Sequence, residues 1–271
     1  MNALDNYSLL DFQFIEIDKL HVRYVDTKDG KNSVLLLHGL GGSVESWTNN
    51  IAELAKQLRT IAIDLPGFGY SDKPKMDYTI KFYWQFVSKL IEELKIRPAV
   101  VGSSLGGHIA IELAINRPDL VSKLVLISPP GALPRTFKGT PALKKYVKVL
   151  QAGSTEQVKK ALAAVDNKPV DNVYADAVYQ KLAMPGAKEA FISAMKGSAK
   201  SRRLNSLLGR IAAPTLVFWG KEDIMIPVKF VEPFAAMKNS RVVLLENCGH
   251  RAHAEKPALF NRILADFVQE G

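Results

Sequence analysis

The five residues Gly102-Ser103-Ser104-Leu105-Gly106 stand between an apolar run at residues 98–101 and a helical pattern over 108–116. This context places Ser104 at a corner between a strand and a helix. Glycines two positions on either side of a serine let the backbone turn so tightly that the hydroxyl projects above the sheet edge, in a strained conformation. The stretch therefore predicts strands followed by helices, and it makes Ser104 a candidate nucleophile.

Strand-like runs alternate with helix-like runs on both sides of this stretch, which predicts an α/β fold with a mainly parallel sheet and helices on both faces. Eight strands are expected, at residues 12–17, 22–26, 34–37, 61–63, 99–101, 124–127, 215–219 and 242–245. The first two alternate apolar with polar residues, so we expect an antiparallel edge hairpin. Helices are expected near residues 46–58, 80–94, 108–116, 228–237 and 257–269.

The alternation stops after the sixth expected strand, where Pro129-Pro130-Gly131 and Pro134 break the chain. Up to about residue 208 the pattern is helical and poor in strands. Apolar residues recur there every three or four positions, which gives each helix one face to bury. Such helices are expected at residues 141–151, 156–164 and 187–198. We therefore predict a core formed by residues 1–131 and 209–271, with a helical cap at 132–208.

Composition describes an ordinary globular chain of 271 residues, with 47% hydrophobic and 23% charged residues. The longest apolar runs have the length of strands, well below the roughly 20 residues of a membrane span. Residues 1–11 contain two aspartates and no basic residue, unlike a secretory leader. A single cysteine, Cys248, excludes an internal disulfide. These features predict a cytoplasmic protein without a membrane span.

The net charge of +9 raises the question of an anionic partner. Basic residues are scattered along the chain, with local pairs on expected helices at Lys144-Lys145, Lys159-Lys160 and Arg202-Arg203. This pattern favours a solvated basic surface and no nucleic-acid partner, and it leaves a homodimer open. No histidines or cysteines stand at metal-ligand spacing, and the glycines after His38 lack the spacing of a phosphate loop. We expect neither a metal nor a cofactor.

A serine hydroxyl needs a base within hydrogen-bond reach and an acid that holds this base in the right tautomer. Asp223 follows the strand at 215–219, and His250 follows the strand at 242–245. Both therefore lie on loops at the carboxyl edge of the sheet, where open α/β sheets bind ligands. The sequence predicts a candidate triad of Ser104, Asp223 and His250.

Each member of this triad has a neighbour of similar chemistry: Ser103, Glu222 and His253. Ser103 lacks the symmetric glycines, so we expect it to line the pocket. Glu222 is expected to be a solvated loop charge, and His253 a capping or surface residue. The other histidines are expected to have structural or surface roles: His21, His38 and His108.

The chain resembles the α/β-hydrolase family over nearly its whole length. The resemblance rests on three motifs in this order: the stretch at 102–106, Gly220-x-x-Asp223 and Gly249-His250. His38-Gly39-Leu40-Gly41-Gly42 and the stretch Asp64-Leu65-Pro66-Gly67-Phe68-Gly69-Tyr70-Ser71 are similar to the esterase and lipase branch. The resemblance implies that the backbone N–H groups of Leu40 and Leu105 form an oxyanion hole. It implies acyl transfer from a small or medium carboxylic ester.

The cap would then set the size of a small-molecule ester substrate, and part of the pocket would come from the core. The expected pocket residues are Ser103, Phe68, Met184, Met225 and Arg251.

An alternative within the family is hydrolysis of a carbon–carbon bond in vinylogous diketones from aromatic ring cleavage. The stretch Asn247-Cys248-Gly249-His250, with Glu255-Lys256-Pro257 and Phe260-Asn261 after it, resembles the tail of those hydrolases. They usually carry asparagine in place of Ser103 and tryptophan in place of Arg251. A perhydrolase and a ligand receptor without turnover are further alternatives, whereas dehalogenases and epoxide hydrolases use an aspartate nucleophile and are excluded by Ser104.

Overall fold

The computed structural model describes residues 10–134, 136–166, 170 and 172–270. One eight-stranded sheet forms its centre, in the order β1-β2-β4-β3-β5-β6-β7-β8. Only β2 runs antiparallel to its two neighbours, and all other pairs are parallel. The predicted edge hairpin and the mainly parallel sheet are confirmed. The strands are β1 (Phe12–Ile17), β2 (Leu20–Asp26), β3 (Ser33–Leu37), β4 (Arg59–Ile63), β5 (Ala99–Ser103), β6 (Lys123–Ile127), β7 (Thr215–Gly220) and β8 (Ser240–Leu245).

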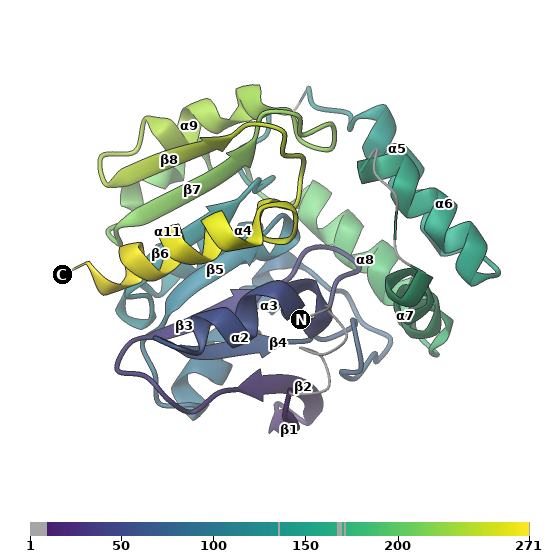
Figure 1. The fold of residues 1–271 in the computed structure, drawn as a ribbon, viewed down its shortest axis with the longest axis horizontal. Coiled ribbons are helices and arrows are strands. Elements are labelled where there is room, and N and C mark those ends of the chain that lie inside the picture. Colours follow the sequence, from purple (N-terminus) through teal and green to yellow (C-terminus); the bar gives the residue numbers. More distant parts are fainter. Residues whose placement is uncertain (1–9, 135, 167–169, 171, 271) are drawn as a thin grey trace.

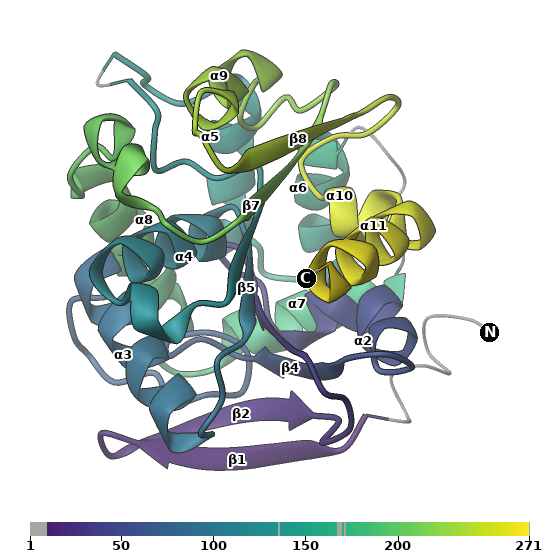
Figure 2. The same cartoon turned by 90° about the vertical axis from the view of Figure 1, so that its left-hand side faces the viewer.

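Helices cover both faces of this sheet (Figure 2). On one face lie α2 (Thr48–Leu54) and α11 (Pro257–Gln269), and on the other α3 (Ile80–Glu93) and α4 (Leu105–Asn116). Strand β3 shows why a continuous apolar run forms here. Val34 and Leu36 belong to the buried cluster of the first face, and Leu35 and Leu37 to that of the second. All four are fully buried, as expected for a strand covered on both sides.

The order of the strands reverses at β3. The chain passes from β3 to β4 on one side of it and returns to β5 on the other. Loops that leave β3 and β5 at their carboxyl ends therefore run apart and open a crevice between them. These are the loops that begin at His38 and Ser104, so the topology itself brings the two motifs together.

Between β6 and β7 the chain forms four helices: α5 (Pro141–Val147), α6 (Thr155–Asp166), α7 (Asn172–Ala183) and α8 (Ala187–Lys200). We call residues 132–208 the helical insertion. Figure 1 shows its helices gathered to one side of the sheet, on the right of that view. The predicted helices at 141–151, 156–164 and 187–198 correspond to α5 with a following 3-10 turn, α6 and α8. The boundaries of a separate cap domain stay a prediction.

Helix α7 was not expected, because its apolar residues are spread around the helix rather than gathered on one face. The helix expected at 46–58 is shorter, since it begins with a 3-10 turn and α2 ends at Leu54. None of the helices in the described ranges is long and apolar enough to cross a membrane. The remaining short elements are η1 (Val44–Trp47), η2 (Pro118–Leu120), η3 (Lys148–Gln151), η4 (Asn205–Arg210), η5 (Val228–Val231), α9 (Glu232–Ala235) and α10 (Ala252–Glu255).

Candidate active site

Ser104 occupies the turn between β5 and α4 with φ 51° and ψ −112°. Such a backbone conformation costs a non-glycine residue about 1–3 kcal/mol and persists only where the surroundings enforce it. Here the Ser104 N–H donates to the carbonyl of Ile127 at 2.8 Å, and its carbonyl accepts from the His108 N–H at 3.0 Å. The strained corner expected from the sequence is therefore present and is held from both sides.

Close packing explains the two glycines that flank this serine. A Cβ added to Gly102 would lie 2.3 Å from the carbonyl oxygen of Gly106, and one added to Gly106 would lie 2.2 Å from that of Leu37 in β3. Any side chain at either position would push α4 away from the sheet. The two glycines let the helix begin directly above the strands, which points the serine toward the carboxyl edge.

Asp223 and His250 are joined by a hydrogen bond of 2.8 Å from the imidazole Nδ1 to the carboxylate Oδ2. The other oxygen of Asp223, Oδ1, accepts the backbone N–H groups of Met225 and Ile226 at 2.9 and 2.8 Å. The carboxylate is fully buried, whereas the imidazole is 12% exposed. A carboxylate with both oxygens engaged cannot rotate, so it fixes both the tautomer and the orientation of His250.

The loop that carries His250 is fastened on both sides of the histidine by one carboxylate. Glu255 accepts the N–H of Gly249 at 3.0 Å and that of Arg251 at 3.1 Å. Gly220, at the end of β7, comes so close to this loop that an added Cβ would lie 2.1 Å from the Cys248 carbonyl. These contacts bring the loops of Asp223 and His250 together, and Glu255 is a positioning residue that the sequence did not single out.

Glu222 was expected to be a solvated loop charge, and it is exposed. Its carboxylate accepts the backbone N–H of Cys248 at 2.8 Å, so it too helps to hold the histidine loop. Asp223, and not Glu222, contacts the imidazole, as the Gly-x-x-Asp spacing predicts.

The loop after β3 directs the N–H of Leu40. The carbonyl of Gly39 accepts the Gly42 N–H at 3.0 Å and the Nδ1–H of His38 at 2.7 Å. Because the peptide between Gly39 and Leu40 is trans, the Leu40 N–H points away from this carbonyl. Gly39 packs against Ser104, since an added Cβ would lie 3.3 Å from the serine Cβ.

His38 acts on this loop as a neutral ring. Its Nε2 accepts the backbone N–H of Leu65 at 3.0 Å, so the ring proton is on Nδ1. The side chain is fully buried, and burial lowers the pKa of His38 below its ordinary value. The structural role expected of His38 is thus to hold the Gly39 carbonyl by a hydrogen bond.

The second expected donor is the N–H of Leu105 at the first position of α4. The first N–H groups of a helix have no carbonyl partner within the helix and are free to face a ligand. Leu40 and Leu105 both line a cavity that contains Ser104.

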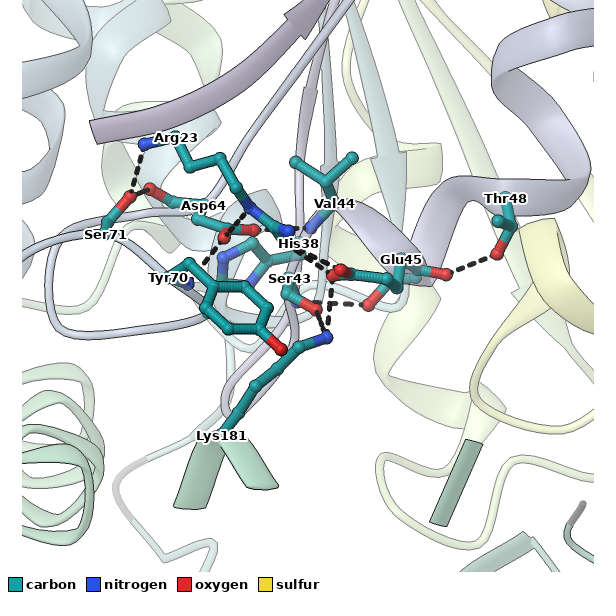
Figure 3. Close-up of polar contacts among 12 residues, drawn as sticks. Arg23, His38, Ser43, Val44, Glu45, Thr48, Asp64, Tyr70, Ser71 and Lys181 are labelled. Atoms are coloured by element: carbon teal, nitrogen blue, oxygen red, sulfur yellow. Dashed lines mark hydrogen bonds and ion pairs between the residues drawn. The ribbon is translucent and has the colours of Figure 1, made fainter. Parts of the chain in front are cut away.

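A buried ionic cluster supports the loop after β3, which contains Leu40 (Figure 3). The Arg23 guanidinium donates Nε–H to Asp64 at 2.7 Å. The fully buried Asp64 carboxylate also accepts the N–H groups of Val44 and Tyr70, each at 2.7 Å. Strand β2, the loop after β4 and the segment after the Leu40 loop are therefore tied to one carboxylate.

Glu45 extends this cluster to the helical insertion. Its carboxylate pairs with Arg23 at 2.8 Å and with Lys181 of α7 at 2.7 Å, and Lys181 also donates to the Ser43 hydroxyl at 2.9 Å. Burial alone would raise the pKa of Glu45, but the two cations and their hydrogen bonds lower it to about 2. Lys181 is thus a link between the insertion and the core that the sequence did not reveal, because its partners are far away in the chain.

Two cavities meet at Ser104 and His250. The smaller arm, about 130 Å³, is lined by Ser103, Tyr174 and Arg251 among others. The larger arm, about 420 Å³, extends along Leu105 toward the insertion. A wider groove between α3 and α8, about 1090 Å³, contains none of the triad residues.

The expected pocket residues divide between these arms and the core. Ser103 and Arg251 line the smaller arm, and Met225 lines both. Phe68 and Met184 line neither. Phe68 is buried with its ring centroid 5.5 Å from that of His38, and Met184 lies just beyond the end of α7.

The remaining histidines are structural in different ways. His253 is not a surface residue, since it is buried with its ring 4.2 Å from that of Trp47, and burial lowers its pKa to about 3. His108 is buried between the hydroxyls of Ser198 and Ser201, both at 3.1 Å, and burial lowers its pKa to about 4. His21 is exposed.

No group of three His, Cys, Asp or Glu side chains suited to hold a metal ion occurs in the described part of the chain. The absence of a cofactor stays a prediction. Ser104, His250, Leu40 and Leu105 line one cavity, and His250 is hydrogen-bonded to Asp223, so the residues predicted for the triad and the oxyanion hole lie together. Their catalytic roles stay a prediction.

Comparison with known families identifies the class. The family model of the alpha/beta hydrolase fold matches residues 32–257, and the chain belongs to this family.

Its relatives include a 2-hydroxy-6-oxononadienedioate/2-hydroxy-6-oxononatrienedioate hydrolase of Paraburkholderia xenovorans, 30% identical, over 92% of this chain and 91% of the relative. A 2-hydroxymuconate semialdehyde hydrolase of a Pseudomonas species is 32% identical, over 88% and 87%. Among solved structures, a meta-cleavage product hydrolase from Pseudomonas fluorescens superposes with a TM-score of 0.82 over 95% of this chain and 97% of the other, at 24% identity. The last likeness shows the fold alone.

The packing of Gly106 gives a test of the strained corner. We expect Gly106→Ala to lower the free energy of unfolding by about 3 kcal/mol or more, because the new Cβ meets rigid backbone. Urea unfolding measures this loss. Gly209→Ala is the matched control, since no atom lies within 4 Å of the added Cβ, and its stability should stay close to that of the parent. Equal losses in the two variants would contradict the packing argument.

The low pKa of Glu45 predicts an acid-sensitive contribution to stability. Its folded-state pKa of about 2 lies below the ordinary value of 4.5, so the contribution is complete above pH 4.5 and is lost as the pH falls toward 2. Over this window the parent should lose about 3 kcal/mol more than Glu45→Gln, measured by urea unfolding at each pH. The exposed Glu53→Gln on α2 is the control and should follow the parent. Parallel curves for the parent and Glu45→Gln would refute the assignment.

Proposed function

We propose that this chain is a serine hydrolase that cleaves a carbon–carbon bond beside a ketone in a carboxylate-bearing, vinylogous diketone. The observation that carries the serine mechanism is the hydrogen bond between buried Asp223 and His250. His250 and Ser104 line the same two cavities. Because Nδ1 carries the proton donated to Asp223, Nε2 is the nitrogen that accepts the Ser104 proton.

In this proposal Ser104 Oγ attacks the ketone carbon while His250 takes the hydroxyl proton. The N–H groups of Leu40 and Leu105 stabilise the resulting oxyanion, an effect worth about 3 kcal/mol for each donor. The tetrahedral intermediate collapses by breaking the carbon–carbon bond, the electron pair moves into the conjugated enone of the leaving group to give a dienolate, and His250 returns the proton to it. Water then hydrolyses the acyl-enzyme with His250 as the base.

Two observations support carbon–carbon cleavage over simple ester hydrolysis. Two of the relatives, at 30% and 32% identity, are named as hydrolases of a 2-hydroxy-6-oxo dienedioate or trienedioate and of 2-hydroxymuconate semialdehyde, and the matches cover most of both chains. The smaller arm contains Arg251, whose guanidinium suits a substrate carboxylate, together with the phenol of Tyr174 at 3.1 Å from it. The tail after His250, with Glu255 bonded to the backbone on both sides of it, gives the resemblance a structural basis.

Hydrolysis of small or medium carboxylic esters is the second candidate. The ground for it is a departure from the usual pattern of the carbon–carbon hydrolases, which carry asparagine in place of Ser103 and tryptophan in place of Arg251 in the smaller arm. The same triad performs both reactions, and an ester needs no conjugated leaving group. The arrangement is also compatible with a perhydrolase, and with a receptor that binds a ligand without turnover.

Turnover assays separate these candidates. We expect the purified protein to cleave a 2-hydroxy-6-oxo dienoate with kcat/KM at least about tenfold above that for p-nitrophenyl butyrate, and Ser104→Ala to lower both by at least about 10⁴-fold. Loss of the dienoate absorbance and release of nitrophenolate are the two readouts. Asp223→Asn is expected to lower kcat by about 10⁴-fold through the wrong histidine tautomer.

The outcomes of these assays are distinct. Rapid ester turnover without dienoate cleavage would establish the second candidate. Full activity of Ser104→Ala would overturn the serine mechanism. Binding of the dienoate without turnover of any substrate would indicate a receptor.

A further inference from the structure

The net positive charge of this protein is concentrated in the helical insertion. Residues 132–208 contain 14 of the 36 lysines and arginines but only 5 of the 27 aspartates and glutamates. The rest of the chain has equal numbers of the two signs, so the insertion accounts for the whole charge of +9. The basic residues look scattered along the sequence because the insertion is a long segment. The excess of positive charge therefore belongs to the insertion, and a role of these cations is to be sought near the active-site cavity.

Part of this charge surrounds the larger arm of the active-site cavity. Four cations stand in its walls: Lys138, Lys144, Lys196 and Arg203. They come from the loop before α5, from α5, from α8 and from the segment after α8, so several separate elements direct cations toward one space. No aspartate or glutamate is among the residues that line this arm.

These four side chains differ from several arginines of the core in having no carboxylate partner among the described residues. Arg23, Arg59 and Arg117 each pair with an acid at 2.7 to 2.8 Å. Arg202 points to Glu112 of α4 at 2.5 Å, whereas its neighbour Arg203, which is half-buried, lines the arm. Within the described residues, none of the four cations of the larger arm has an ion-pair or hydrogen-bond partner. An anion that enters the larger arm would therefore meet a partly buried arginine that has no carboxylate of the protein beside it.

The smaller arm is basic as well. Arg251 lies in its wall, and here too no aspartate or glutamate lines the cavity. The two arms share Ser104 and His250, so a substrate that reaches into both has its reacting carbon between two cationic regions.

We infer that the substrate carries an anionic oxyacid group, carboxylate or phosphate, at each of its two ends, with the distal group held in the larger arm by Arg203 and Lys196. This deepens the proposed function and rests on it for the reaction, but not for binding. Arg203 provides a planar, fork-shaped set of donors that matches a carboxylate or phosphate, and Lys196 provides a point charge at the exposed side of the arm. Lys138 and Lys144 add attraction at longer range.

The competing interpretation is that the larger arm accepts an apolar tail. Its walls also contain Leu133, Phe137, Val147 and Met195, and the cations would then serve only to keep the insertion soluble. The two interpretations predict opposite orders of affinity for ligands that differ only in the charge of the distal end.

Binding to Ser104→Ala tests this inference without any turnover. Isothermal titration calorimetry compares nonanedioate with its monomethyl ester, which has the same chain and one charge fewer, and with nonanoate. We expect nonanedioate to bind at least about tenfold more tightly than the monomethyl ester. An ω-phosphono carboxylate of matched length shows whether phosphate or carboxylate suits the distal position better.

Variants in the Ser104→Ala background assign the distal group to its residues. Arg203→Met should weaken nonanedioate about tenfold and Lys196→Met about fivefold, while the monomethyl ester changes less than twofold in both. Lys188→Met is the matched control, because it removes a charge from the first turn of α8, away from both arms, and it should change neither affinity. Thermal unfolding confirms that each variant is folded.

Three results would overturn the inference: tighter binding of nonanoate or the monomethyl ester than of nonanedioate, no effect of Arg203→Met, or an equal effect of Lys188→Met. Failure of the proposed reaction looks different. In that case nonanedioate binds with the expected pattern, but the parent enzyme does not cleave a dienoate.

Discussion

The close approach of α4 to β3 and β5 at two glycines is the constraint on which the site depends. Neither Gly102 nor Gly106 has room for a side chain, so the helix lies directly against the strands. Ser104 alone separates β5 from α4, and it is forced into a strained conformation above the sheet. The same contact places the first N–H groups of α4 beside the loop after β3. Nucleophile, helix N-terminus and Leu40 loop are thus consequences of a single packing arrangement.

Around this corner the protein uses buried polar contacts to hold loops that have no regular structure of their own. Asp64 collects N–H groups from the segment behind the Leu40 loop, His38 holds the Gly39 carbonyl, and Glu255 holds the loop of His250. Backbone groups buried in loops must find such partners, since water cannot reach them. Preorganised loops in turn keep their donors and the imidazole in place without reorganisation during a reaction.

The helical insertion contributes contacts and charge rather than catalytic groups. Lys181 joins it to Glu45 of the core, and Tyr146 of α5 donates a hydrogen bond of 2.7 Å to the carbonyl of Leu40, so insertion helices touch the loop that presents the Leu40 N–H. The insertion also supplies the cations of the larger arm. Shape and charge of the larger arm are therefore set largely by this segment, while the candidate catalytic residues Ser104, Asp223 and His250 come from the core.

The sequence by itself determined the strands, the order of the fold and the three candidate catalytic residues, because these depend on local patterns: apolar runs, glycine spacing, and the positions of polar residues just after strands. It did not determine that Phe68 packs against His38, that Glu222 and Glu255 hold the histidine loop, that His253 is buried, or that Lys181 meets Glu45. Those facts depend on contacts between segments far apart in the chain, whose distances no local pattern contains. Only the tertiary structure could decide which cations of a basic chain converge on one cavity.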